Sequence, residues 1–549
     1  MPLQKNQVLT LQVERLSSDG SGVAHSPEGE TVFIPGAAPG DEARVRIVKD
    51  CKRYAFGILD EVLTPSPDRI PVDCAVAGPC GGCSLRHLDY AAELRAKQEN
   101  VADSFARIGG LDVPVLPIVG SPEIDRYRNK VQFPVGTDKA GRPCIGFYAG
   151  RTHRIVPCPD CRLQPGVLNE IGNTLCAFFA EKGIHPYNEE TGKGLVRHIF
   201  LRRGAHSGQI MVCLVCTRAK LPSAEELCTR LKEAFPDIVT ILLNVNAKNT
   251  NVILGSETHT LYGQGYIEDT LCGVPVQLGP LSFYQVNTLA AEQLYGIATE
   301  YAQLTPDDLL LDLYCGMGTI GLSMADHCRE LVGVEIVPEA IESAKANAAR
   351  MGAAVSAKSR FFCADAGQAA AQLAAEGLHP DVVMLDPPRK GCDEATLSAV
   401  VRMAPRRVVY VSCNPATAAR DAAWLEQNGY HAEKVQPVDL FPRTKHVECV
   451  IVLSKGEIDS KKVRVEFSLE GMDTSGLQKG ATYPEIKARV LEQTGLKVSS
   501  LYISQVKQKC GLEVRENHHK AKSENTKQPQ CPKEKEDAIV EALKHFQMI

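Results

Sequence analysis

The sequence predicts an α/β protein whose main domain is a Rossmann-like doubly wound sheet, with a small β-barrel before it and a helical module after it. Between residues 283 and 454, apolar strand-like runs alternate with helical patterns, an order typical of a parallel sheet covered by helices. Residues 1–62 instead hold short β-like runs between Gly, Pro and Asp turns, which favours a barrel. The Lys-rich residues 456–549 differ in composition, which indicates a separate accessory module.

The length of 549 residues suits roughly three to four domains. A Pro-rich hinge from Pro65 to Pro71 separates the barrel from a segment rich in cysteine. We expect an OB-like β-barrel at 1–62, a cysteine segment at 63–90, a central α+β domain at 91–282, the doubly wound domain at 283–454 and the accessory module at 456–549.

Composition narrows the class of protein. The net charge is −5, with 61 basic and 66 acidic side chains, so a nucleic-acid-binding surface would have to come from local clustering. No apolar run is long enough to span a membrane, and residues 1–6 lack the apolar stretch of a signal peptide. We therefore expect a cytoplasmic protein, a monomer without a membrane partner, whose 20 cysteines stay reduced and serve metal binding or catalysis where they cluster.

The barrel has four clear strand-like runs, at residues 8–13, 31–34, 43–48 and 56–59. A Gly-rich loop is expected at residues 19–24. Basic and aromatic side chains follow the third run: Lys49, Lys52, Arg53 and Tyr54. Barrels of this type use such side chains to hold phosphates and to stack bases. An ordinary five-stranded barrel without a ligand is the alternative.

Five cysteines in two groups predict a metal centre. Cys74, Cys80 and Cys83 lie within ten residues of one another, and Cys158 and Cys161 form a second group. Zinc and iron–sulfur clusters both take four thiolates, and the two CxxC pairs would also suit zinc. Spacing alone leaves both metals open. The radical enzymes that use S-adenosylmethionine require a CxxxCxxC spacing, which this chain lacks.

A strand, an acid and a glycine turn predict a nucleotide-cofactor site. Asp312 lies in the apolar run 309–313, Gly316 and Gly318 follow it, and Glu335 ends the next strand. The Glu335 carboxylate suits a pair of ribose hydroxyls. Dinucleotide binding shares this layout, but Asp312 would repel a pyrophosphate and attract the positive groups of S-adenosylmethionine. The pattern therefore favours the methyl donor.

Two further strand ends carry reactive side chains at the same predicted edge. Cys413 follows the run 408–412 directly before a Pro that stops the strand, so its thiol can reach a bound ligand. Asp386 precedes the turn Pro387-Pro388, and Arg389 follows it. An Arg at that position does not suit methylation of exocyclic nitrogens, and the turn lacks the second Cys that 5-methylcytosine formation needs. Uracil C5 remains as the target.

Methylation of uracil at C5 explains both a thiol and a carboxylate. C5 is a poor nucleophile until a thiolate adds to C6, and the C5 proton must leave before the thiolate is expelled. Glu448, at the start of a terminal strand whose apolar run is 450–453, is the candidate base. A surface acid at a strand end is the structural alternative for Glu448.

Five ordered motifs in the doubly wound domain resemble those of the RNA uracil-5-methyltransferases. They are Phe283-Tyr-Gln-Val-Asn287, Asp312-Leu-Tyr-Cys-Gly-Met-Gly318, Leu385-Asp-Pro-Pro-Arg-Lys-Gly391, Ser412-Cys-Asn-Pro415 and His446-Val-Glu448. The start of the chain resembles the TRAM domain, and together with Cys74, Cys80 and Cys83 it is similar to the iron–sulfur branch that modifies large-subunit 23S ribosomal RNA. The resemblance covers about residues 1–454.

The resemblance implies a role for each candidate residue. Cys413 is implied as the nucleophile and Glu448 as the base, and the implied S-adenosylmethionine contacts are Gln285, Tyr314, Glu335 and Asp386. It also implies a 4Fe-4S cluster held by Cys74, Cys80, Cys83 and Cys161, with Cys158 as a bystander, and it places Arg128, Asn129 and Lys130 near the RNA. A transfer-RNA substrate and a non-catalytic iron–sulfur RNA-binding protein are the alternatives. The intact Cys413 and Glu448 favour the enzyme.

The accessory module shows two helix patterns. Thr482 to Glu485 forms a capping box before Ile486, Val490 and Leu491, and Gly495 is expected to stop that helix. Ser499 or Ser500 can cap a second helix with Leu501, Tyr502, Val506, Lys507 and Lys509, and residues 513–536 are expected to be mostly loop. The pair resembles a helix-turn-helix that contacts RNA, although such pairs are more often plain packing units.

Overall fold

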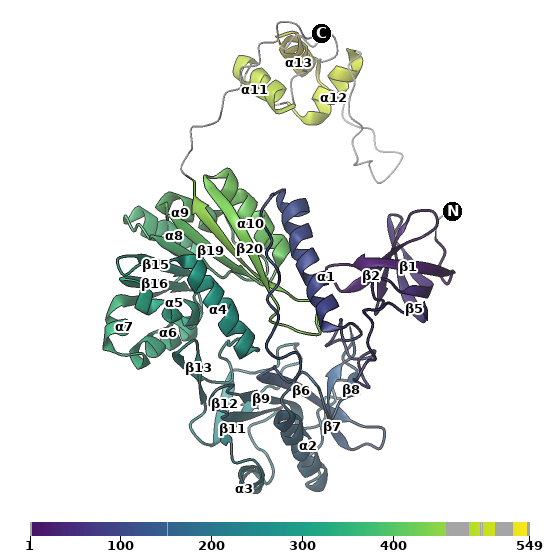
Figure 1. Cartoon of the computed structure of the whole chain (residues 1–549), viewed down its shortest axis with the longest axis vertical. Coiled ribbons are helices and arrows are strands. Elements are labelled where there is room, and N and C mark those ends of the chain that lie inside the picture. Colours follow the sequence, from purple (N-terminus) through teal and green to yellow (C-terminus); the bar gives the residue numbers. More distant parts are fainter. Residues whose placement is uncertain are drawn as a thin grey trace. The chain divides into compact units, whose positions relative to one another are not determined.

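The computed structural model describes residues 3–150, 152–456, 483–494, 496, 498–510 and 531–545. The chain forms two compact units, Met1–Asp459 and Ser460–Ile549 (Figure 1). None of the helices in the described residues is both long enough and apolar enough to cross a membrane.

The first domain is a closed five-stranded barrel in the order β1-β2-β3-β5-β4. Its strands are β1 (Val8–Leu16), β2 (Ser21–His25), β3 (Thr31–Pro35), β4 (Glu42–Asp50) and β5 (Tyr54–Thr64). Strand β2 occupies most of the stretch predicted as a loop. Gly20 turns the chain at φ +80°, and Gly22 lies so close to Ala37 and Val13 that a Cβ would stand 2.9 Å from each. The Gly residues thus serve barrel closure, a role that their loop-like composition concealed.

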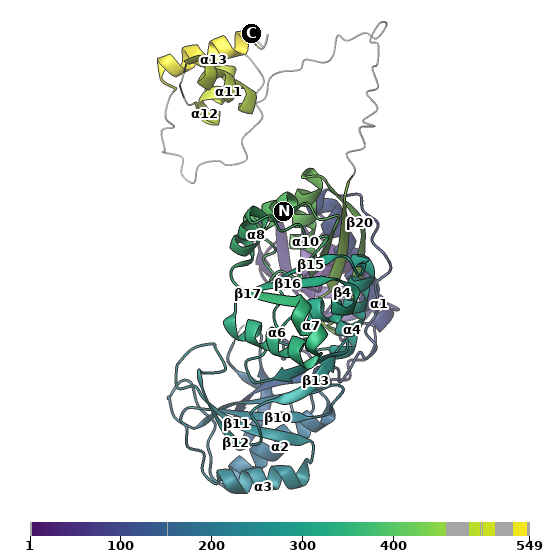
Figure 2. The same ribbon diagram turned by 90° about the vertical axis from the view of Figure 1, so that its left-hand side faces the viewer.

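The central domain is built on a seven-stranded sheet in the order β12-β11-β10-β9-β6-β7-β8. These strands are β6 (Lys130–Thr137), β7 (Pro143–Tyr148), β8 (Ile155–Pro157), β9 (Val196–Arg203), β10 (Ile210–Cys216), β11 (Ile238–Val245) and β12 (Glu257–Tyr262). Helices α2 (Gly166–Glu181) and α3 (Ala224–Ala234) pack into one core on one face of this sheet (Figure 2). The other face shares a core with the hairpin β13 (Ile267–Leu271) and β14 (Val274–Leu278) and with the methyltransferase-like sheet that follows.

The second seven-stranded sheet has the order β17-β16-β15-β18-β19-β21-β20. Its strands are β15 (Leu309–Leu313), β16 (Glu330–Glu335), β17 (Ser359–Cys363), β18 (Val382–Leu385), β19 (Arg407–Ser412), β20 (Tyr430–Val438) and β21 (Glu448–Lys455). The first five are parallel, and β21 inserts antiparallel between β19 and β20. The chain order reverses between β15 and β18, and ligands bind at such switch points in open α/β sheets.

Helices cover both faces of this sheet, as its continuous apolar strands require. On one face lie α4 (Thr288–Ala302), α5 (Thr319–Ser323), α6 (Pro338–Arg350) and α7 (Ala353–Lys358), with the 3-10 turn η2 (Ala325–His327). On the other face lie α8 (Ala366–Ala375), α9 (Glu394–Met403) and α10 (Pro415–Gln427). The predicted α/β architecture, a TRAM-type barrel ahead of a Rossmann-like domain, is therefore present.

An N-terminal helix packs on the Rossmann-like domain. Helix α1 (Tyr90–Asp103) and the π-helical turn η1 (Ser104–Gly109) contribute Val101 and Phe105 to the core beneath α9 and α10. Residues 115 and 119 then form parallel bridges to 435 and 438 of β20. The sequence placed this segment in the central domain, which was expected to begin at residue 91. The structure differs because helical periodicity does not reveal which sheet a helix covers.

In its described residues, the second unit contains three helices: α11 (Tyr483–Thr494), α12 (Ser500–Lys509) and α13 (Lys533–His545). They share a small core that includes Ile486, Ile503 and Ile539. Ser499 caps α12 by accepting a hydrogen bond from the Tyr502 amide at 3.3 Å. The predicted capping box and Gly495 lie outside the described residues or side chains. Helix α13 begins inside the predicted loop 513–536. Its apolar residues, such as Ile539, pack into the core that α11 and α12 share.

Candidate active site

The candidate residues of the Rossmann-like domain meet at one edge of the sheet. Asp312, Asp386 and Cys413 come from the carboxyl ends of β15, β18 and β19. Glu448 begins β21, and because β21 runs antiparallel, its start lies at that same edge. Ser412 pairs with Cys449 in antiparallel register. Cys413, the residue after Ser412, is therefore brought close to Glu448, the residue before Cys449. Strand polarity, which cannot be read from an apolar run, decides this juxtaposition.

The glycine turn after β15 is held by two carboxylates. Asp312 is 1% exposed, and its Oδ2 accepts a hydrogen bond from the Gly321 amide at 3.0 Å. Glu335 Oε2 accepts from the Gly316 amide at 3.2 Å, while Oε1 accepts from the amides of Ile336 and Val337. Both acids therefore shape the loop, with backbone φ of +54° at Gly316 and +79° at Gly318, values that L side chains rarely adopt.

Asp312 has an unsatisfied oxygen that suits a cationic ligand. Its Oδ1 is buried without a hydrogen-bond partner among the described residues. Burial, with smaller contributions from the charges of Asp386 and Glu335, raises the pKa of Asp312 to about 8. A buried acceptor of this kind is unfavourable unless a donor reaches it. This free acceptor therefore fits the amino group of S-adenosylmethionine, which can donate a hydrogen bond to it.

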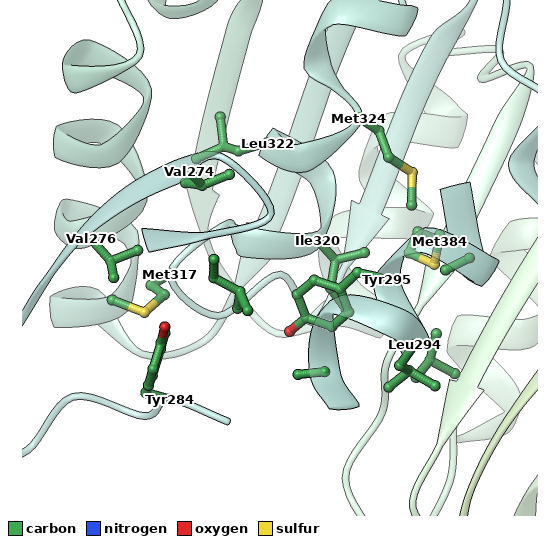
Figure 3. Packing of buried hydrophobic residues seen from close by; sticks show 14 of the residues in the cluster. Val274, Val276, Tyr284, Leu294, Tyr295, Met317, Ile320, Leu322, Met324 and Met384 are labelled. Atoms are coloured by element: carbon green, nitrogen blue, oxygen red, sulfur yellow. The ribbon is translucent and has the colours of Figure 1, made fainter. Parts of the chain in front are cut away.

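Gln285 and Tyr314 both make side-chain contacts near this turn. The Gln285 side chain hydrogen-bonds the buried Tyr295 hydroxyl, whose pKa is raised by burial and then by Asp386. In Figure 3, the Tyr295 ring lies beside Ile320 of the turn helix, and Tyr284 lies beside Met317. Tyr314 has φ +65°, and its hydroxyl lies 3.3 Å from Thr396 Oγ1. Its polar end is thus used within the protein, which leaves the ring and the backbone for a ligand.

Cys413 is a partly exposed thiol in a negative environment. Burial raises its pKa, and the charges of Glu448 and Asp386 raise it further. Arg389 acts in the opposite direction through its charge and a side-chain hydrogen bond to the thiol. The Asn414 side chain caps α10 by accepting from the Ala416 amide at 3.2 Å, so the cysteine sits at the strand-to-helix turn. Arg389 is therefore the group that favours the thiolate.

Glu448 is a buried carboxyl with a raised pKa. It is 6% exposed, and burial, followed by the charge of Asp386, raises its pKa to about 8, while Arg389 lowers it. Burial likewise raises the pKa of Asp386 to about 7. A carboxyl whose pKa is near the working pH can accept a proton in one step and release it in the next. Arg389, noted in the sequence only as unsuited to N-methylation, thus contacts the reacting centre.

The five clustered cysteines also converge. Burial, with smaller contributions from the charges of Cys161, Cys80 and Cys74, raises the pKa of Cys83 to about 12. A side-chain hydrogen bond between Cys158 and Cys161 lowers the pKa of Cys161 and raises that of Cys158. In the described residues, no three His, Cys, Asp or Glu side chains have the close spacing of a single-ion site. Cys74, Cys80, Cys83 and Cys161 are four neighbouring thiols, a set of ligands that both zinc and iron–sulfur clusters use.

The chain matches two family models and a set of relatives. Residues 276–456 match "tRNA (Uracil-5-)-methyltransferase", and residues 2–59 match "TRAM domain". An RNA methyltransferase of Halalkalibacterium halodurans is 44% identical over 82% of this chain and 98% of the relative. One from Clostridium tetani is 41% identical over 83% of this chain and 98% of the relative.

A solved structure shares the architecture. It is the Pyrococcus abyssi tRNA (uracil-54, C5)-methyltransferase in complex with S-adenosyl-L-homocysteine, 28% identical, with a TM-score of 0.64 over 81% of this chain and all of that chain. The fold and the edge site define a Rossmann-like methyltransferase. The chain belongs to the RNA uracil-5-methyltransferase family and carries a TRAM domain.

Proposed function

We propose that this protein transfers a methyl group from S-adenosylmethionine to C5 of a specific uridine in RNA. The observation that carries the proposal is the meeting of Cys413, Glu448 and Arg389 at the edge formed by the carboxyl ends of β18 and β19 and the start of β21. A thiol and a carboxyl are the two groups that C5 methylation of uracil requires.

In the proposed mechanism, the Cys413 thiolate, favoured by Arg389, adds to C6 of the uracil, so that C5 becomes nucleophilic. S-adenosylmethionine supplies the electrophilic methyl group. Asp312 and Glu335 hold the glycine turn and orient the donor, and Gln285, Tyr314 and Asp386 line its site. Glu448 then removes the C5 proton, and the bond between Cys413 and C6 breaks to release the product.

We propose 23S ribosomal RNA as the substrate. The support is the pairing of a TRAM-type barrel with the cysteine segment. The barrel presents Tyr54, which is 41% exposed and packs edge-on against Phe33 at 5.7 Å, beside Lys49, Lys52 and Arg53. A transfer-RNA uridine is the second candidate, because the Pyrococcus abyssi enzyme acts on tRNA and all of its chain aligns with this protein. Mapping 5-methyluridine in ribosomal and transfer RNA, with and without the protein, tests both. Unchanged 5-methyluridine in both RNA pools would overturn the proposal.

We also propose that Cys74, Cys80, Cys83 and Cys161 hold a 4Fe-4S cluster, with Cys158 as a neighbour and not a ligand. The Cys161→Ser protein, purified without oxygen, should then lose iron and the brown absorbance, whereas the Cys158→Ser protein should keep both. Metal analysis and absorbance spectra provide the measurement. Stoichiometric zinc without iron in the unmodified protein would refute the assignment.

A further inference from the structure

Arg389 reaches the Cys413 thiol from an exposed loop. Its neighbours Pro388 and Lys390 are exposed with it, whereas Gly391, the next residue, is buried. The Arg389 guanidinium hydrogen-bonds the thiol and favours its ionised form. A long side chain on an exposed loop keeps one position only where other contacts hold the backbone that carries it. The contacts that hold this loop therefore bear on the reactivity of the thiol.

The first turn of α10, directly after the nucleophile, holds the backbone of Arg389 itself. Asn414 Nδ2 donates to the Arg389 carbonyl at 2.9 Å, and Thr417 Oγ1 donates to the same oxygen at 3.3 Å. The helix that follows the thiol and the loop that carries the arginine are therefore joined directly.

The second turn of α10 holds the next residues of the loop through Asp421, whose side chain is buried. Asp421 is 1% exposed, and its Oδ2 accepts from the Cys392 amide at 2.8 Å and from the Tyr410 hydroxyl at 2.6 Å. Its Oδ1 accepts from Arg420 Nε at 2.8 Å, and Arg420 Nη2 donates to the carbonyls of Lys390 and Cys392, at 3.0 and 3.3 Å. One carboxylate thus ties the loop to the helix and to β19, the strand that leads to the thiol.

Gly391 shows how closely the loop and the helix approach each other. It turns the chain with φ +78°, and a Cβ on it would stand 2.5 Å from both Arg420 Nη2 and Asp421 Oδ2. Only glycine permits an approach this close with that backbone conformation. The substitution Gly391→Ala would therefore push the loop away from the helix without changing any charge.

The charged groups that face the thiol come from β21, from the end of β18 and from the loop. Burial raises the pKa of the thiol, the charges of Glu448 on β21 and Asp386 after β18 raise it further, and Arg389 lowers it. Cys449 on β21 is a neighbouring thiol, whose own pKa is raised by burial. Asp421 is not among the largest of these influences. Its loss should therefore reach the thiol through Arg389.

We propose that Asp421 is a positioning residue of the methyl-transfer site, which fixes residues 389–392 so that the Arg389 guanidinium stays on the Cys413 thiol. The inference rests on the proposed function and adds to it a residue that acts through Arg389 and not on the substrate. A direct effect of the Asp421 charge is the alternative, and it has the opposite sign. Loss of a negative charge alone would favour the thiolate, whereas loss of the Arg389 contact would disfavour it.

The test measures the reactivity of Cys413 in the full chain, because the thiolate is the form that reacts with iodoacetamide. The rate of alkylation is followed across pH by mass spectrometry of the peptide that contains Cys413, which separates it from the other cysteines. The variants are Asp421→Ala, Arg389→Met, the two together, and Gly391→Ala. The acids that face the thiol remain in every variant, so their titration is common to all.

Asp308→Ala is the matched control, because Asp308 is also a buried carboxylate that holds a backbone amide and an arginine. It is 6% exposed, accepts from the Thr305 amide at 2.6 Å and pairs with Arg406 at 2.5 Å. It lies directly before β15, at the end of the sheet opposite to the thiol. Its loss should lower the melting temperature, as the loss of Asp421 should, but leave the alkylation of Cys413 unchanged.

Asp421→Ala should slow the alkylation of Cys413 roughly tenfold below the midpoint of its pH profile and should move that midpoint to higher pH. Arg389→Met should have the same effect, and the double variant should match Arg389→Met alone, because both changes remove one contact. Gly391→Ala should act in the same direction, although it changes no charge. If Asp421→Ala does not fold, Gly391→Ala and its combination with Arg389→Met decide the question.

The positioning role would be overturned by an unchanged profile in Arg389→Met, or in both Asp421→Ala and Gly391→Ala. Faster alkylation in Asp421→Ala would assign a direct effect of the charge instead, and additive effects of Asp421→Ala and Arg389→Met would exclude action through Arg389. Alkylation requires neither RNA nor S-adenosylmethionine. A protein whose thiol responds as expected but that forms no 5-methyluridine would therefore refute the proposed function and leave the positioning role standing.

Discussion

Cys413 and Glu448 act at different steps of the proposed reaction, so their loss should leave different products. We predict that Cys413→Ala forms no adduct and no 5-methyluridine. Glu448→Gln should add to C6 and receive the methyl group but stall before the C5 proton leaves, because the base is absent. A denaturing gel should show a slow-migrating protein–RNA band that requires both S-adenosylmethionine and Cys413. Full turnover by Glu448→Gln would mean that another residue is the base.

The raised pKa of Glu448 predicts how release of the product depends on pH. A base must be ionised, and burial with the charge of Asp386 holds the pKa of Glu448 at about 8. Below that pH the carboxyl is protonated, so the adduct should resolve slowly; the rate should rise with pH and level off above about 8. Single-turnover decay of the pre-formed adduct measures this step apart from thiol addition. A flat profile would contradict the assignment.

At the scale of elements, helix α1 holds the loop that leads to the base, residues 439–447. Lys97 donates to Glu93 Oε1, Asp439 Oδ1 and the Phe441 carbonyl. Glu93 Oε1 in turn accepts from the Arg443 amide at 2.7 Å. The buried network thus fixes the first half of the loop that precedes Glu448, residues 439–443.

We predict that Lys97→Met slows adduct decay more than adduct formation, because Glu448 loses its support while Cys413 on β19 does not. It should also destabilise the protein by about 3–5 kcal/mol, since Glu93 and Asp439 are left buried and unpaired. Arg406→Met is the control: it breaks the Asp308 ion pair at the opposite end of the sheet. It should lower stability without changing the ratio of the two rates. Equal slowing of both steps by Lys97→Met would argue for a structural role only.

At the scale of the whole molecule, we expect the second unit to take no part in the catalytic chemistry. The uracil-5-methyltransferase family model ends at residue 456, before its first helix. Lys507 is 7% exposed, and Lys509 pairs with Glu536 at 2.8 Å, so both lysines of the predicted second helix have contacts within the module.

We therefore predict that a chain ending at Lys455 folds, methylates RNA and binds it as tightly as the full chain. Parallel titrations of the two proteins with the same RNA, at one salt concentration, provide the measurement. A loss of affinity in the shorter chain would restore RNA contact as the role of the second unit.

The sequence alone determined the order of the chemistry-bearing segments. The barrel, the glycine turn after Asp312 and the alternating strands and helices are local patterns, set by residue type and spacing over a few residues. The Cys413 thiol could be placed at a strand end for the same reason. The third helix of the second unit was missed, because its polar residues match a loop as well as an exposed helix face.

Only the tertiary structure decided which of these segments meet. The antiparallel insertion of β21 sets Glu448 against Cys413, and the packing of α1 on the Rossmann-like sheet fixes the loop before Glu448. Arg389 owes its role to Cys413 and Glu448, neighbours that are distant in the chain. Long-range strand pairing and burial create the pKa shifts at this site, and both depend on contacts that residue spacing does not encode.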